Sequence, residues 1–448
     1  MHQPKKVGIL VGGGPAPGIN AVIGAATIRA ALSGYDVVGV LDGFHWLMKG
    51  DIEHVRRLTI EDVSRIHFRG GSHLGIARTN PTRSEHLLES TIGALLRLEV
   101  DKLITIGGDD TCFSASQIEQ KASGRVRVAH VPKTIDDDLD LPDGADTFGF
   151  QTARHLGVQI VENLMVDAKT THRWYFLVAM GRKAGHLALG IGKAAGATLT
   201  LIPEEFPEGP IRLKSVVDTL ACAIVKRLAG GRPDGVAILA EGLVERMEEH
   251  DFEGLAGVER DAHGHLRIAE IAFGDILKQR VQQRLGAFGL KATIVAKNIG
   301  YELRCADPIP YDMDYARDLG YCAAKYLIEG GNAAMVSMTG GAFRPIPFAT
   351  MMNLDTGRVR VRMVDIESDR YMIARRYMLR LRRDDFEDPS ELAKFASVLN
   401  LSTLEEFSNE FRYLVEDEPV PRVFFPEQGA SRPSPAPMHG TPSVRVKV

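Results

Sequence analysis

The residues that could do chemistry lie in short polar loops, each directly after an apolar run that is typical of a strand. The loop after residues 126–131 contains Lys133, Thr134 and the three carboxylates Asp136–Asp138. A lysine can bind a phosphate, and carboxylates beside it can take a proton or hold a hard cation. A solvated acidic surface is the simpler interpretation, but a place after an apolar strand favours a ligand site.

Two glycine-rich loops also come directly after an apolar run that is typical of a strand. Asp109 and Asp110 follow the run 103–106 and two glycines. Mg²⁺ is the natural partner of such carboxylates, although they could instead cap the next helix. The loop Gly12–Gly18 follows 7–11 and could bring a phosphate to backbone N–H groups, or could be a plain turn. Its spacing is not GxxxxGK[ST], which argues against a P-loop enzyme.

Three later loops add possible contacts for a phosphorylated sugar. They hold, in chain order, Met180, Gly181 and Arg182, then Glu241, then Tyr301 and Arg304. Arg182 could form a bidentate pair with a phosphate or be structural. The candidate phosphate-binding cations are Arg78, Lys133, Arg173, Arg182 and Arg304. Cations, a metal carboxylate and a spare aspartate are what phosphoryl transfer to a hydroxyl requires.

The elements that must position these loops alternate between short strands and longer helices for about 340 residues, which is typical of a parallel sheet covered by helices. We therefore predict an α/β fold. The expected strands are 7–11, 37–40, 103–106, 126–131, 175–179, 198–202, 236–239, 293–296 and 334–338. The expected helices are 19–32, 152–167, 211–228, 271–285 and 315–328.

The composition excludes several classes of partner. Lys plus Arg number 54 and Asp plus Glu 58, a net charge of −4, so no general basic field exists for nucleic acid or an anionic membrane. No apolar stretch reaches the roughly 18 residues of a membrane span, and no signal-like segment follows Met1, which predicts a cytoplasmic protein. The four cysteines lack CxxC spacing and predict neither a zinc site nor disulfides.

The motifs, taken in order, resemble those of bacterial-type 6-phosphofructokinases over about residues 5–341. They are GGxxAPGxN from Gly12, GxAR ending at Arg78, GGDD, PKTIDDD, GFxTA from Gly149, MGR, a glutamate after a strand, and YxxR. Several motifs in one order are far more specific than any one alone. The resemblance implies two Rossmann-like domains with parallel sheets flanked by helices, and Mg²⁺-dependent phosphoryl transfer to fructose 6-phosphate.

The same resemblance implies a role for each residue. Asp136 would deprotonate the sugar 1-hydroxyl, while Asp109 and Asp138 would hold Mg²⁺. Gly13 and Lys133 would bind the donor, and Arg78 would steady the transferring group. The sugar phosphate would contact Thr134, Ile135, Asp136, Met180, Gly181, Arg182, Glu241, Tyr301 and Arg304. Arg173 matches a residue that a neighbouring subunit lends to the site, which implies a homodimer or homotetramer with shared active sites.

The choice of donor depends on Asp110 and Lys133. ATP-dependent bacterial members usually have glycine in place of Asp110, and PGTID where this chain has PKTID. The Asp110 carboxylate would occupy the space of an ATP α-phosphate and repel it, whereas Lys133 would neutralise a leaving phosphate. We therefore predict diphosphate as the donor, in a reversible reaction that gives fructose 1,6-bisphosphate and phosphate. Asp137 replaces the usual Asn, and the sequence does not show the sign of its effect.

Two alternatives stay open. The first is an ATP-dependent 6-phosphofructokinase of the same fold. The second, from another class, is a Rossmann-like dehydrogenase or a non-catalytic nucleotide or sugar-phosphate sensor. Against the dehydrogenase, the first loop lacks GxGxxG followed by a well-placed acidic residue.

We predict that residues 1–140, with part of 251–330, form a donor and Mg²⁺ domain, and that 141–250 form a sugar-phosphate domain. Residues 331–415 are expected to be an appended α/β region with a strand at 358–363 and a helix at 371–381, and we assign them no catalytic role. From 416 to 448 frequent prolines predict a flexible tail.

Overall fold

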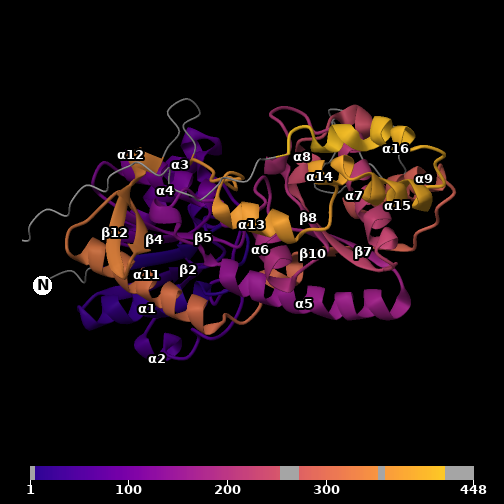
Figure 1. The fold of residues 1–448 in the computed structure, drawn as a ribbon. Coiled ribbons are helices and arrows are strands. Elements are labelled where there is room, and N and C mark those ends of the chain that lie inside the picture. The colour runs from indigo at the N-terminus through magenta and orange to yellow at the C-terminus, as the bar shows by residue number, and fades with distance from the viewer. Residues whose placement is uncertain (1–5, 253–271, 352–358, 419–448) are drawn as a thin grey trace, which may run out of the picture.

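The computed structural model describes residues 6–252, 272–351 and 359–418, which form two α/β halves that lie side by side (Figure 1). The first half contains a mostly parallel sheet in the order β12-β11-β5-β4-β1-β2-β3, with β6 beside β5. Its strands are β1 (Lys6–Val11), β2 (Asp36–Val40), β3 (Val55–Leu58), β4 (Val100–Gly107), β5 (Arg127–Thr134), β6 (Phe148–Gly149), β11 (Ala334–Thr339) and β12 (Ala342–Pro347). The two outermost strands, β3 and β12, are antiparallel to their neighbours.

The second half contains a four-stranded parallel sheet in the order β10-β7-β9-β8. Its strands are β7 (Trp174–Ala179), β8 (Leu199–Leu201), β9 (Gly235–Ala240) and β10 (Ile294–Ile299). The two inner strands, β7 and β9, are apolar and fully buried, because both faces of a parallel strand are covered, whereas the outer strand β10 exposes Lys297 and Asn298.

Alternate residues of each central strand enter different hydrophobic cores. In β1, Val7, Ile9 and Val11 pack beneath α1 (Ile19–Leu32) and α11 (Pro310–Ile328), whereas Leu10 packs on the opposite face beneath α3 (Glu85–Arg97) and α4 (Asp109–Ala122). This follows from the two-residue period of a strand. The sheet of the first half is therefore covered on both faces, and a ligand is expected at the carboxyl ends of its strands.

Helices cover the second sheet in the same way. They are α5 (Phe150–Thr171), α6 (His186–Ala195), α7 (Leu213–Ala229), α8 (Gly242–Glu245), α9 (Phe273–Gly286) and α10 (Tyr301–Arg304), together with α13 (Asp369–Tyr377), α14 (Arg383–Glu387), α15 (Pro389–Val398) and α16 (Leu404–Phe411). The short helices α2 (Ile60–Val63) and α12 (Phe348–Met351) belong to the first half. Among the helices in the described ranges, none is long and apolar enough to cross a membrane.

The chain returns to each half, so the described residues of 331–415, expected to form an appended α/β region, are instead parts of the two halves. β11 pairs in parallel with β5 and so extends the first sheet. The later helices bury Tyr371, Phe395 and Phe407 in the core of the second half. These apolar elements have no core of their own, so they complete two existing ones.

Other boundaries also differ from the expected ones. In the described part of the expected strand at 358–363, residues 359–363, there are only isolated bridges, one of them between Leu139 and Val361; residue 358 lies outside the described residues. The helix expected at 371–381 runs from Asp369 to Tyr377. Glu418, placed in the expected tail, accepts a hydrogen bond from the backbone of Arg383 at 2.8 Å. The rest of that tail, residues 419–448, lies outside the described residues.

Candidate active site

The predicted site residues gather where the carboxyl ends of β4 and β5 face those of β7 and β9. An ion pair joins the two halves here, because Arg182, after β7, lies with its Nη1 2.8 Å from Oδ1 of Asp109 at the start of α4. The same nitrogen lies 3.9 Å from Oδ2 of Asp138. The site is therefore built from both halves, as expected for an open α/β sheet.

Lys133 and Thr134 lie in β5, which extends three residues beyond the expected strand, so they are not loop residues as predicted. The Lys133 side chain is buried and its Nζ donates a hydrogen bond to the Gly14 carbonyl. Burial lowers the pKa of Lys133 to about 8, and the nearby Arg304 and Arg78 add to this, while Asp136 opposes it. A buried cation of this kind is stabilised by an anionic ligand.

Asp136 has a buried carboxylate with an unused acceptor. The residue is 7% exposed, its backbone N–H donates to Thr134 Oγ1 at 3.0 Å, and its Oδ1 has no hydrogen-bond partner among the described residues. Burial and, after it, the charge of Asp138 raise its pKa to about 7, against the opposing charge of Arg182. A general base that works near neutral pH needs such a pKa.

Three cations converge on the first glycine-rich loop. A Cβ on Gly14 would lie 3.1 Å from Arg304 Nη1 and 3.5 Å from Arg78 Nη2, and one on Gly13 would lie 3.4 Å from Lys133 Nζ. Gly13 has a φ of +83°, which also favours glycine. The absence of side chains at Gly13 and Gly14 leaves a small space beside clustered positive charge, as a polyphosphate requires.

Asp109 and Asp110 form the first turn of α4, whose N-cap Gly108 provides no side-chain cap. Asp109 faces Arg182, whereas Asp110 is exposed. The capping alternative is therefore not what the structure shows, and the backbone N–H groups of this turn are available to an anion.

Glu241 shapes the loop after β7. Its Oε2 accepts hydrogen bonds from the backbone N–H groups of Gly181 and Arg182, both at 3.3 Å, and Met180 donates to the carbonyl of Ile299 at 3.0 Å. Arg182 has a φ of +51°, an uncommon conformation for a residue with a side chain. Strain of this kind is maintained by its surroundings and is often found at functional sites.

Three predicted residues have contrasting positions. Tyr301 is 77% exposed, and the Arg304 guanidinium lies 4.5 Å from its ring centroid. The Ile135 side chain is buried in the core of the second half, so contact with a ligand there would come from its main chain. Arg173 precedes β7, at the opposite end of the strand from Met180, about 20 Å away by the rise of a strand. The structure therefore brings together the predicted residues except Arg173.

Two residues that sequence reasoning missed support the site from a distance. The buried Asp312 of α11 accepts hydrogen bonds from the backbone N–H groups of Gly149 and Thr152, at 2.8 and 2.7 Å, and so fixes the start of α5. Arg362, from the segment to which no role was assigned, pairs with Asp137 at 2.6 Å. Neither shows a local signal, because each acts on residues more than 150 positions away.

The model of one protein family, phosphofructokinase, matches residues 6–327. This chain belongs to the phosphofructokinase family. A relative from Thermotoga maritima is 49% identical over 92% of this chain and 99% of its own, and one from Naegleria fowleri is 45% identical over 92% and 97%. Both are named pyrophosphate–fructose 6-phosphate 1-phosphotransferase.

Solved structures confirm the predicted fold class for this phosphofructokinase. The pyrophosphate-dependent phosphofructokinase of Marinobacter aquaeolei superposes with a TM-score of 0.62, covering 89% of this chain and 92% of that one. The enzyme from Nitrosospira multiformis, of the same description, gives a TM-score of 0.63 with 84% and 91% covered. The sequence identities are only 17% and 16%, so these two superpositions show a shared fold and nothing further.

Proposed function

We propose that this phosphofructokinase transfers a phosphoryl group from diphosphate to fructose 6-phosphate, giving fructose 1,6-bisphosphate and phosphate, and that the reaction runs in both directions. The observation that supports it most is the convergence of Lys133, Arg78 and Arg304 on Gly13 and Gly14, together with the buried Asp136 Oδ1, which has no hydrogen-bond partner among the described residues. The names of the two long relatives agree with it. A cytoplasmic location belongs to the same proposal.

Each group has a chemical task in this reaction. The free Asp136 oxygen takes the proton of the sugar 1-hydroxyl as the new O–P bond forms. Lys133, Arg78 and Arg304 neutralise the phosphoryl oxygens, and Lys133 stabilises the charge that grows on the leaving phosphate. Glu241 holds the loop of Arg182 on the sugar-phosphate side, and Arg182 joins that loop to Asp109 of the other half.

Asp109 and Asp138 would hold Mg²⁺, whose charge would neutralise diphosphate oxygens. An oxygen of each carboxylate lies near the same Arg182 nitrogen, at 2.8 and 3.9 Å, so both face one position that attracts a cation. Among the described residues no three His, Cys, Asp or Glu side chains form a metal site by themselves. This donor set fits Mg²⁺, because that ion is usually bound by one or two carboxylates together with substrate phosphates.

The donor is tested by initial rates with fructose 6-phosphate and Mg²⁺, comparing diphosphate with ATP. A relative from Streptomyces coelicolor named ATP-dependent 6-phosphofructokinase 3 is 30% identical over 75% of this chain, so ATP is the specific alternative. We expect a high initial rate with diphosphate and a much lower one with ATP. Asp110→Gly should gain measurable ATP-dependent activity, because it removes the carboxylate that repels an α-phosphate.

Other outcomes of this assay decide between the alternatives. Equal use of ATP and diphosphate by the parent enzyme would contradict the role of Asp110. Binding of fructose 6-phosphate without turnover by either donor would instead favour a sensor.

We also propose that the enzyme is a homodimer or homotetramer with shared sites. Arg173 lies at the wrong end of β7 to reach the site of its own chain, which supports its donation to a neighbour. Arg173→Ala and Asp136→Ala should each be nearly inactive alone. Mixed after reversible dissociation, they should regain part of the activity, since some hybrid sites then carry both native residues. No recovery after proven subunit exchange would show that each chain is self-sufficient.

A further inference from the structure

Residues 359–364, here called the strap, lie between the two loops that carry the chemistry. On one side Val361 bridges Leu139, and the Arg362 N–H donates to the Asp138 carbonyl at 2.8 Å. On the other side the Arg362 carbonyl lies 3.2 Å from His186 Nε2, just after the loop that contains Arg182. The strap is therefore in direct contact with both halves at the site.

The Arg362 side chain holds the base loop, residues 134–147, at several points. Its guanidinium pairs with Asp137 Oδ2 at 2.6 Å and donates to the carbonyls of Asp137, at 3.1 Å, and Ala145, at 3.3 Å. The other oxygen of Asp137 accepts the Thr147 N–H at 2.9 Å. Asp137 has a φ of +57° and lies directly beside Asp136. The side chain of Arg362 is 17% exposed and that of Asp137 6%, so neither charge is screened well by water.

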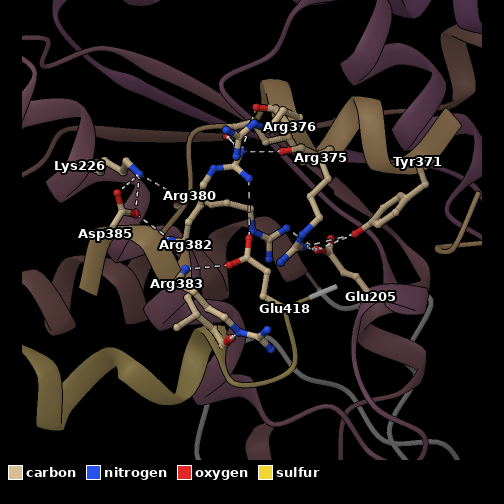
Figure 2. Close-up of polar contacts among 12 residues, drawn as sticks. Glu205, Lys226, Tyr371, Arg375, Arg376, Arg380, Arg382, Arg383, Asp385 and Glu418 are labelled. Carbon is tan, nitrogen blue, oxygen red and sulfur yellow. Dashed lines mark hydrogen bonds and ion pairs between the residues drawn. The ribbon is translucent and has the colours of Figure 1, made fainter. Parts of the chain in front are cut away.

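The strap is itself fixed by a neighbouring group of charges. Glu204 Oε1 accepts the N–H groups of Val364, at 3.0 Å, and Gly185, at 2.9 Å. The next residue, Glu205, contacts the Tyr371 hydroxyl and the guanidinium groups of Arg375 and Arg380, as Figure 2 shows. Beyond these, Lys226 pairs with Asp385 at 2.6 Å. Glu204 therefore secures the end of the strap to the second half, and the C-terminal helices fix the adjacent Glu205.

We propose that Arg362 is a positioning residue for the reaction, which holds Asp136 in place by pairing with Asp137. This inference rests on the proposed function. It explains why an extra carboxylate is tolerated beside the base, since the strap provides the cation that compensates it. Asp137 and Arg362 therefore act as a pair: the buried negative charge of Asp137 is compensated by the positive charge of Arg362.

The test is a double-mutant cycle on turnover and on backbone exchange. Arg362→Ala should lower kcat by about 10- to 100-fold with smaller changes in KM, because the base is displaced but the binding cations stay. Asp137→Asn alone should have a small effect, and adding it to Arg362→Ala should restore much of the lost kcat, since no uncompensated charge then remains. If Arg362→Ala does not fold, Arg362→Lys keeps the charge but not the forked contacts, and should lower kcat by a smaller factor.

Arg360→Ala is the matched control. Arg360 is in the same segment but half exposed, with its Nε 3.5 Å from Asp140, and its loss should leave kcat within about twofold. Hydrogen exchange of residues 134–147 should accelerate in Arg362→Ala and not in the control, a readout that does not depend on any substrate. Unchanged kcat and exchange in folded Arg362→Ala, or additive effects of the two substitutions, would overturn the proposal. If the parent enzyme were inactive but hydrogen exchange of residues 134–147 still accelerated in Arg362→Ala and not in Arg360→Ala, only the proposed function would be contradicted.

Discussion

Asp136→Ala should lower turnover by about two to four decades, with much smaller changes in substrate affinity. The reason is that Asp136 combines a free, buried acceptor oxygen with a pKa raised by burial to about 7, so it can accept the proton of the sugar hydroxyl. Initial rates at saturating diphosphate and fructose 6-phosphate measure this, normalised to folded protein. Asp136→Asn keeps the shape of the side chain and should be equally impaired.

Asp140→Asn is the matched control for Asp136. It lies four residues further along the chain and faces the exposed Arg360 at 3.5 Å, so its charge has little part in the site. A turnover in Asp136→Ala above a tenth of the parent value would reject the assignment. Equal losses in Asp140→Asn would show that general disturbance of the loop, not loss of the base, is the cause.

Lys133→Met should lower the diphosphate-dependent rate by about two decades, equivalent to roughly 3 kcal/mol of transition-state stabilisation. The methionine keeps most of the length of the side chain but has no charge for the leaving phosphate. Lys121→Met is the exposed control. Lys121 lies near the C-terminal end of α4, away from Asp109, and the variant should have a rate close to that of the parent enzyme. A Lys133→Met enzyme with normal kcat and only a raised KM would show that Lys133 binds the donor without assisting the transfer.

The lowered pKa of Lys133 adds a pH dependence to this prediction. Because burial brings the pKa to about 8, the free enzyme loses this positive charge as the pH rises through that value. The kcat/KM for diphosphate should therefore fall above about pH 8, since this ratio reports the free enzyme. Lys133→Arg stays charged and should lose this alkaline fall, whatever its absolute rate.

The parts of the site that were predictable are the reactive side chains that come directly after an apolar strand in the sequence. Asp109, Lys133, Asp136, Arg182 and Glu241 each lie at the carboxyl end of a recognisable apolar strand, and the structure brings those ends together. The orientation of Asp137 could not be foreseen, because the group that compensates it, Arg362, is 225 residues away in the sequence. The same holds for β11, an apolar strand of the right type whose place beside β5 depends on tertiary pairing alone.

The pairing of β5 with β11 has a consequence for the order in which the protein folds as it is synthesised. The four strands of the second sheet lie within residues 174–299, so they can pair with one another before β11 is made, although the later helices still have to complete the core of that half. The first sheet cannot: β6 pairs with Lys133 and Thr134, but the rest of that side of β5 waits for a partner that is translated about 200 residues later. During that interval β5 has unpaired backbone groups on an apolar strand, and such an edge favours association with other chains. The nascent chain is therefore most exposed to aggregation after β5 has emerged and before β11 has paired with it.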